Sequence, residues 1–66
     1  MKLSSKTVRA DRKRWIEYQS EKVGNRRLTF NTNLSSECYV SLGLKTLYKG
    51  TNVKAAVDAY NAVAAN

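Results

Sequence analysis

The stretch "RRLTFNTNLSSE", residues 26–37, carries the clearest secondary-structure signal in the chain. Within it, apolar or small side chains alternate with hydroxyl and amide side chains. The first set is Leu28, Phe30, Thr32 and Leu34, and the second set is Thr29, Asn31 and Asn33. This alternation predicts a β-strand over residues 27–34 with one face in a core. Because Asn is uncommon in strands, its presence on the outward face favours a binding role over solubility alone.

The composition argues against catalysis. The chain has 66 residues, no His and one Cys. This length allows one domain with a small core, which commonly depends on a partner chain. Without His, neither a His-based catalytic set nor a typical zinc site can form, and one Cys gives no intrachain disulfide. We therefore expect a binding protein with no catalytic residues, no metal and no cofactor, rather than an enzyme.

Positive charge is concentrated near the N-terminus. The chain holds 12 Lys and Arg against 5 Asp and Glu, and residues 1–27 account for +6 of the net charge of +7. This asymmetry suggests a polyanionic partner, either a nucleic acid or an anionic membrane surface. No apolar run approaches a membrane span, and residues 1–6 lack the apolar core of a signal peptide. We therefore expect a cytoplasmic protein.

Three helical segments are predicted around the strand. Residues 9–24 have helix-forming composition and end at a Gly, after a loose polar arm over residues 1–8. Residues 35–50 are expected to form a helix with one apolar face made of Val40, Leu44, Leu47 and Tyr48. Thr51 or Asn52 is expected to cap a last helix, whose apolar face consists of Val53, Ala56, Val57, Tyr60 and Val63 or Ala64.

A lone strand cannot satisfy its own backbone hydrogen bonds. Because these segments leave no second strand candidate, we expect the strand to pair with a copy of itself. Two copies would form an antiparallel two-stranded ribbon on a dimer axis.

A strand followed by two helices, with such a ribbon, resembles the ribbon-helix-helix family of DNA-binding proteins, which includes the Arc and methionine repressors. The resemblance covers residues 27–64. It rests on "RLTFNTNL", on a helix start right after Leu34 and on "KGTNV" between the helices. It implies a mostly α fold with one short strand and an intertwined homodimer. The chain would then consist of a basic N-terminal arm, residues 1–26, which can be helical, and a ribbon-helix-helix domain, residues 27–66.

The resemblance also implies the contacts to DNA. In the family, outward strand residues enter the major groove, and the start of the second helix grips a phosphate through its N–H groups. The implied base contacts are Thr29, Asn31 and Asn33, and Asn suits adenine in particular. The implied phosphate contacts are Arg27, Lys49, Thr51, Asn52, Val53 and Lys54. The arm would add nonspecific attraction through Arg9, Arg12, Lys13, Arg14 and Arg26.

The sequence thus predicts a nucleoid-associated homodimer that binds double-stranded DNA with sequence preference, as a transcriptional repressor or a plasmid partition (centromere-binding) protein. Such dimers can assemble further along DNA. One alternative is the antitoxin of a toxin–antitoxin pair. Another is a basic protein–protein adaptor that uses its N-terminal arm. A third is a membrane-surface helix over residues 9–23, which its sparse apolar face argues against.

Overall fold

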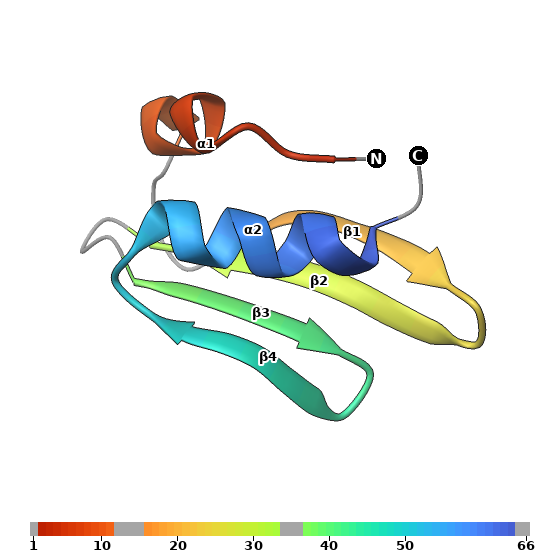
Figure 1. Cartoon of the computed structure of the whole chain (residues 1–66). Coiled ribbons are helices and arrows are strands. Elements are labelled where there is room, and N and C mark those ends of the chain that lie inside the picture. Colours follow the sequence, from red (N-terminus) through yellow and green to blue (C-terminus); the bar gives the residue numbers. More distant parts are fainter. Residues whose placement is uncertain (1, 12–15, 34–36, 65–66) are drawn as a thin grey trace.

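Two helices cover one side of an antiparallel sheet in the computed structural model, which describes residues 2–11, 16–33 and 37–64 (Figure 1). The elements in chain order are α1 (Ser5–Asp11), β1 (Ile16–Val23), β2 (Arg26–Thr32), β3 (Cys38–Leu42), β4 (Lys45–Gly50) and α2 (Val53–Val63). The strands lie side by side in sequence order, and each pairs with the next in antiparallel orientation. Neither helix of the described part has the length and apolarity needed to cross a membrane.

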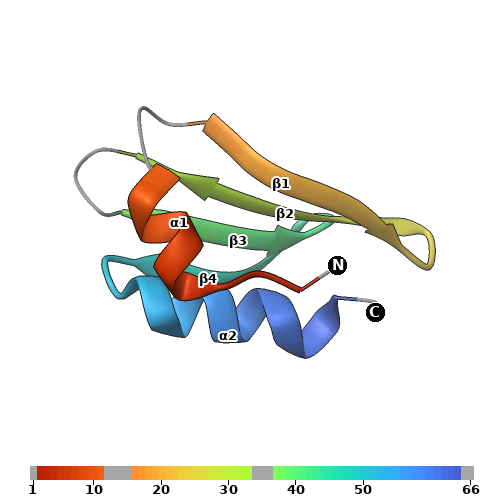
Figure 2. The same ribbon diagram turned by 90° about the horizontal axis from the view of Figure 1, so that it is seen from above.

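Two tight turns make this meander possible. Residues 24–25 join β1 to β2, and residues 43–44 join β3 to β4. In each turn the first residue is a glycine with positive φ, 63° at Gly24 and 60° at Gly43. Two-residue hairpin turns of the primed types require this conformation at that position, and glycine adopts it without strain. Both turns lie at the same end of the sheet, and α1 lies near the other end (Figure 2).

The predicted strand is real and lies inside the sheet. β2 pairs with β1 on one side and with β3 on the other. Leu28, Phe30 and Thr32 are fully buried, whereas Thr29 and Asn31 between them are only partly buried. The predicted alternation is therefore confirmed across β2. The backbone of β2 finds its hydrogen-bond partners within the same chain.

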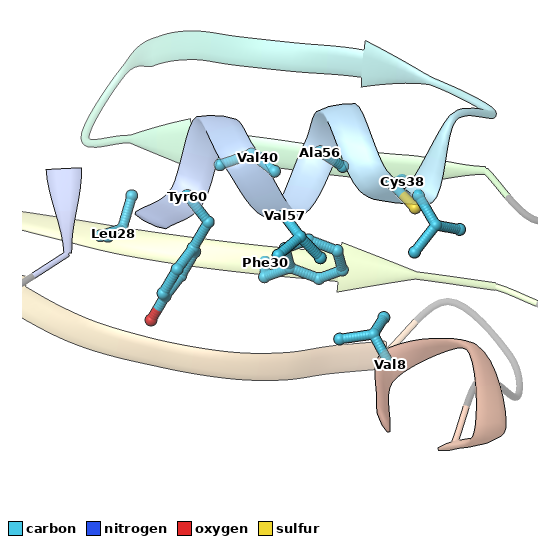
Figure 3. Close-up of a cluster of buried hydrophobic side chains, with 9 residues drawn as sticks. Val8, Leu28, Phe30, Cys38, Val40, Ala56, Val57 and Tyr60 are labelled. Carbon is cyan, nitrogen blue, oxygen red and sulfur yellow. The ribbon is translucent and has the colours of Figure 1, made fainter. Parts of the chain in front are cut away.

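The core lies between β2, β3 and the helices. Phe30 packs edge-to-face against Tyr18 and Tyr60, with ring centroids 6.1 Å apart in both pairs. Figure 3 shows Val8 of α1 reaching the same cluster, in which Val57 lies beside Phe30. Edge-to-face pairs of this kind add stability beyond the area that they bury. The aromatic contacts thus pack β1, through Tyr18, and α2, through Tyr60, against the central strand β2.

The last helix is confirmed with its cap. α2 begins after Asn52, whose side-chain oxygen accepts a hydrogen bond from the Ala55 backbone N–H at 3.1 Å. Its buried residues are the expected ones, namely Val53, Ala56, Val57 and Tyr60. A stripe with this spacing covers one side of a helix and packs it onto the sheet.

The N-terminal segment belongs to the fold. Leu3 and Asn61 exchange two hydrogen bonds, from Leu3 N–H to Asn61 Oδ1 at 2.7 Å and from Asn61 Nδ2 to the Leu3 carbonyl at 2.9 Å. Val8 of α1 is fully buried. The expectation of a loose arm over residues 1–8 was therefore wrong for residues 2–8, and residue 1 lies outside the described residues.

The prediction of a mostly α ribbon-helix-helix fold was wrong, because the described residues form a four-stranded sheet with two short helices. The segment read as a helix over residues 9–24 contains the end of α1 and all of β1. The segment read as a helix over residues 35–50 contains β3 and β4. Leu44, expected on an apolar helix face, is fully exposed at a hairpin turn. The inter-subunit ribbon is replaced by pairing of β2 with β1 and β3 in one chain.

A polar cluster joins α2 to β1 at the margin of the core. The Tyr60 hydroxyl donates to Glu21 Oε1 at 2.9 Å and accepts from Gln19 Nε2 at 3.1 Å. The pKa of Tyr60 is raised from 10.0 to about 12, mainly because the hydroxyl is buried and also because the Glu21 carboxylate is near, while the hydrogen bond from Gln19 acts in the opposite direction. The folded protein therefore holds the Tyr60 proton more tightly than the unfolded chain does.

This difference predicts a loss of stability at alkaline pH. The Tyr60 contribution should be complete below pH 10 and should disappear as the pH rises from 10 to about 12. Denaturant unfolding of the wild type and of Tyr60→Phe should therefore give free energies that differ most below pH 10 and converge toward pH 12. Other alkaline titrations cancel in this comparison. A constant difference across that range would contradict the proposed linkage.

Candidate functional site

The side of the sheet away from the helices is uncovered by any element that the structure describes (Figure 1). Side chains on a strand alternate between faces, and directly paired residues share a face. The residues that point away from the core can therefore be taken from the register of the three strand pairs. We call this surface the open face, and its members are Glu17, Ser20, Lys22, Arg27, Thr29, Asn31, Tyr39, Ser41, Thr46 and Lys49.

A row of four hydroxyl side chains crosses the middle of the open face. The strand register pairs Ser20 with Thr29, Thr29 with Ser41, and Ser41 with Thr46. Each strand thus contributes one hydroxyl group, which can both donate and accept a hydrogen bond. Such a row suits a ligand that presents donors and acceptors along an edge.

A second row lies beside it and carries larger groups. Here the register pairs Glu17 with Asn31, Asn31 with Tyr39, and Tyr39 with Lys49. Toward the hairpin turns, Lys22 lies opposite Arg27. The open face is therefore polar throughout, and the only aromatic ring on it is that of Tyr39 among the described residues.

Hydrogen bonds fix the two sides of the open face and leave its middle available. On one side, Arg27 Nη1 donates to Ser20 Oγ at 2.9 Å, and Ser20 Oγ donates to Glu17 Oε2 at 3.0 Å. On the other side, the Tyr39 and Thr46 hydroxyls lie 3.2 Å apart. Within the described part of the chain, the side chains of Thr29, Asn31 and Ser41 make no hydrogen bond. The middle strands thus present donors and acceptors to an incoming ligand.

The charge of the open face is positive, with Lys22, Arg27 and Lys49 against Glu17. Two more cations, Arg26 and Lys45, stand at the hairpin end, where with Gly43 and Leu44 they line an open depression. The Arg26 side chain crosses Gly43, with its Cδ 3.5 Å from the point where a Cβ would stand. The sheet therefore presents an excess of positive charge on its open face and at its hairpin end.

Four of the predicted DNA contacts come together on this surface. Thr29 and Asn31, expected to contact bases, point outward from β2. Arg27 and Lys49, expected to contact phosphates, lie on the same face. The sheet therefore gathers part of the predicted site without a second subunit.

Asn33 does not lie with them. It is buried just after β2, where its Nδ2 donates to Glu37 Oε1 at 3.0 Å and its Oδ1 accepts from the Glu37 N–H at 3.1 Å. Its backbone N–H donates to the Glu37 carbonyl at 3.2 Å, and the Thr32 hydroxyl donates to the same carbonyl at 3.2 Å. Asn33 thus links the end of β2 to Glu37, the residue just before β3.

The predicted contacts at the start of α2 lie in the helical layer, away from the open face. Val53 is buried, and Lys54 pairs with Asp58 at 3.1 Å. The Asn52 side chain caps the helix, while its backbone N–H donates to the Tyr48 hydroxyl at 3.0 Å. Thr51 precedes this cap and is exposed. These residues and the open face belong to opposite layers of the fold.

The arm residues are spread over several places. Arg26 stands at the hairpin end and is exposed, and Arg9 belongs to α1. Arg12, Lys13 and Arg14 lie outside the described residues.

Sequence reasoning missed six residues of the open face because it read their strands as helices. These residues are Glu17, Ser20, Lys22, Tyr39, Ser41 and Thr46. A signal was available in the two Gly-initiated pairs of residues, 24–25 and 43–44, at which a helix would have to stop.

A scan against protein-family models and searches of curated proteins and of solved structures found no match to this chain.

The contacts of Asn33 predict a structural role that Asn31 does not share. Asn33→Ala should lower the free energy of unfolding by about 1–3 kcal/mol, because it removes a buried side chain and its two part-buried hydrogen bonds to Glu37. Asn31→Ala should change the same quantity by no more than about 0.5 kcal/mol, as expected for a partly exposed position. Urea unfolding of both variants measures this difference. Equal effects of the two substitutions would contradict the assignment.

Proposed function

We propose that this protein binds double-stranded DNA and places the open face of its sheet in the major groove. The observation that carries the proposal is the chemistry of that face. It offers hydroxyl, amide, guanidinium and ammonium groups, and none of its ten described members has an aliphatic side chain that would favour a protein or lipid partner. Its charge is complementary to a polyanion.

The dimensions of a sheet suit the groove. Neighbouring strands lie about 4.7–4.9 Å apart, so the two middle strands fit within the groove, and the axes of the two outer strands of the four-stranded sheet lie about 14–15 Å apart. The major groove of B-DNA is about 12 Å wide and accepts strands as well as helices. The middle strands β2 and β3 would then lie over the base edges, and the outer strands β1 and β4 would lie near the phosphate walls.

The residue types match this division. Asn31 on β2 can donate to adenine N7 and accept from its N6 amino group, while Thr29 can contact a thymine methyl. Lys22 on β1 and Lys49 on β4 are exposed and can reach phosphates on either side. Base contacts would therefore come from the centre of the face, and phosphate contacts from its margins.

One chain carries the complete open face. The homodimer expected from the sequence was needed to supply a partner for the lone strand, and β2 has both neighbours in its own chain. We therefore propose that a single chain binds DNA. A role in repression or in partition in the nucleoid is compatible with this mode of binding.

Asn31→Ala should weaken binding to the preferred site by about 1–3 kcal/mol, because a bidentate contact to adenine is lost. Its binding to random-sequence duplex at the same salt concentration should change little. The preferred site would first be selected from random duplexes with the wild type, and affinities would be measured by fluorescence anisotropy. Equal losses on selected and random duplexes would contradict a base contact by Asn31.

Lys49→Ala should reduce the slope of log affinity against log salt concentration by roughly 0.9, since one phosphate contact is removed. Lys54→Ala is the matched control, because it removes the same charge from the helical layer, where Lys54 already pairs with Asp58. Equal slopes for both variants would contradict the placement of the open face on DNA. Preference for single-stranded RNA or for an acidic protein over duplex DNA at low salt would overturn the proposed function.

A further inference from the structure

Arg27 is not left free at the hairpin end. It donates through Nη1 to Ser20 Oγ at 2.9 Å, and Ser20 in turn donates to Glu17 Oε2 at 3.0 Å. The register places Lys22 directly opposite Arg27. Repulsion between these two cations favours the Arg27 rotamer that turns away from Lys22 and toward the Glu17 carboxylate. The guanidinium is therefore held over the face by a chain of two hydrogen bonds.

On the basis of the DNA-binding proposal above, we infer that Arg27 reads a guanine and that Ser20 and Glu17 are positioning residues that hold it for this contact. A guanidinium has five N–H donors in a fixed plane, and the bond to Ser20 uses one of them. The remaining donors can span O6 and N7 of guanine, the commonest specific contact in the major groove.

Positioning matters because arginine is long and flexible. An arginine that is free in solution loses rotamer freedom when it docks on a base, which weakens binding. The bond to Ser20 orders Arg27 before DNA arrives. Glu17 also repels phosphates, so Arg27, which is held toward it, is favoured to contact a base, while Lys22 nearer the hairpin turn stays available to a phosphate. Specificity for a base pair then depends on two residues that need not contact the base.

The same geometry predicts the spacing of the bases. Because Arg27 bonds to Ser20, its guanidinium stands near the level of Thr29, which pairs with Ser20. Asn31 lies two residues further along β2, a separation of about 7 Å. Base pairs in B-DNA are stacked about 3.4 Å apart along the axis. With β2 along the groove, the guanine and the adenine should lie about two base pairs apart.

Selection of bound sequences from random duplexes, followed by competition binding with each base at the guanine position, tests this inference. Arg27→Lys keeps the charge and removes the planar fork. It should lower the preference for guanine by roughly 5–150-fold, with little change on random duplex. Ser20→Ala and Glu17→Gln should each lower it by roughly two- to tenfold, which reflects the cost of ordering one long side chain.

Asp58→Asn is the control for Glu17→Gln, because it makes the same charge change on α2, away from the open face. It should keep the wild-type preference for guanine, even where the added positive charge strengthens nonspecific binding. Wild-type base preference in Arg27→Lys, or in both Ser20→Ala and Glu17→Gln, would overturn the inference and leave the DNA-binding proposal standing. Failure of the wild type to bind any duplex at low salt would overturn that proposal and the inference with it.

Discussion

The pairing of β2 on both sides is the constraint on which the rest of this structure depends. Because β1 and β3 satisfy its backbone, β2 can commit one set of side chains to the core and the other to the open face. Leu28 and Phe30 then anchor α2 and the aromatic cluster, while Thr29 and Asn31 stay available outside. A chain of 66 residues has room for one small core, and this arrangement builds that core from one side of a single sheet.

The sequence pattern clearly predicts the central strand and the last helix. In β2 and in α2, hydrophobic residues follow the period of the element that forms. In the outer strands they do not. A register shift in β1 between Glu17 and Gln19 lets Tyr18 and Gln19 both reach the side of the core. A similar irregularity in β4 lets Leu47 and Tyr48 both pack inward. Bulges of this kind remove the two-residue alternation by which a strand is recognised.

The same irregularities explain why the helix prediction for residues 35–50 was attractive and wrong. Val40, Leu44, Leu47 and Tyr48 have helical spacing in the sequence, but Leu44 lies in a turn and is fully exposed. Local propensity over such a short segment is weak, and sheet pairing with β2 outweighs it. The outward position of Thr29 and Asn31 could be predicted, because it depends on alternation in β2 alone. The contribution of β1 and β3 to the open face depends on pairing between strands that the sequence pattern conceals, and the burial of Asn33 goes with hydrogen bonds to Glu37 that alternation does not predict.

In the proposed function, the open face, and not the helical layer, is the surface that meets DNA. Titration of the isotopically labelled protein with a selected duplex, followed by NMR of backbone and side-chain amides, tests this most directly. We expect the shifts to concentrate at Ser20, Thr29, Asn31 and Ser41, with the signals of Asn52 to Asp58 nearly unchanged. Shifts confined to the start of α2, with the open face unaffected, would contradict it.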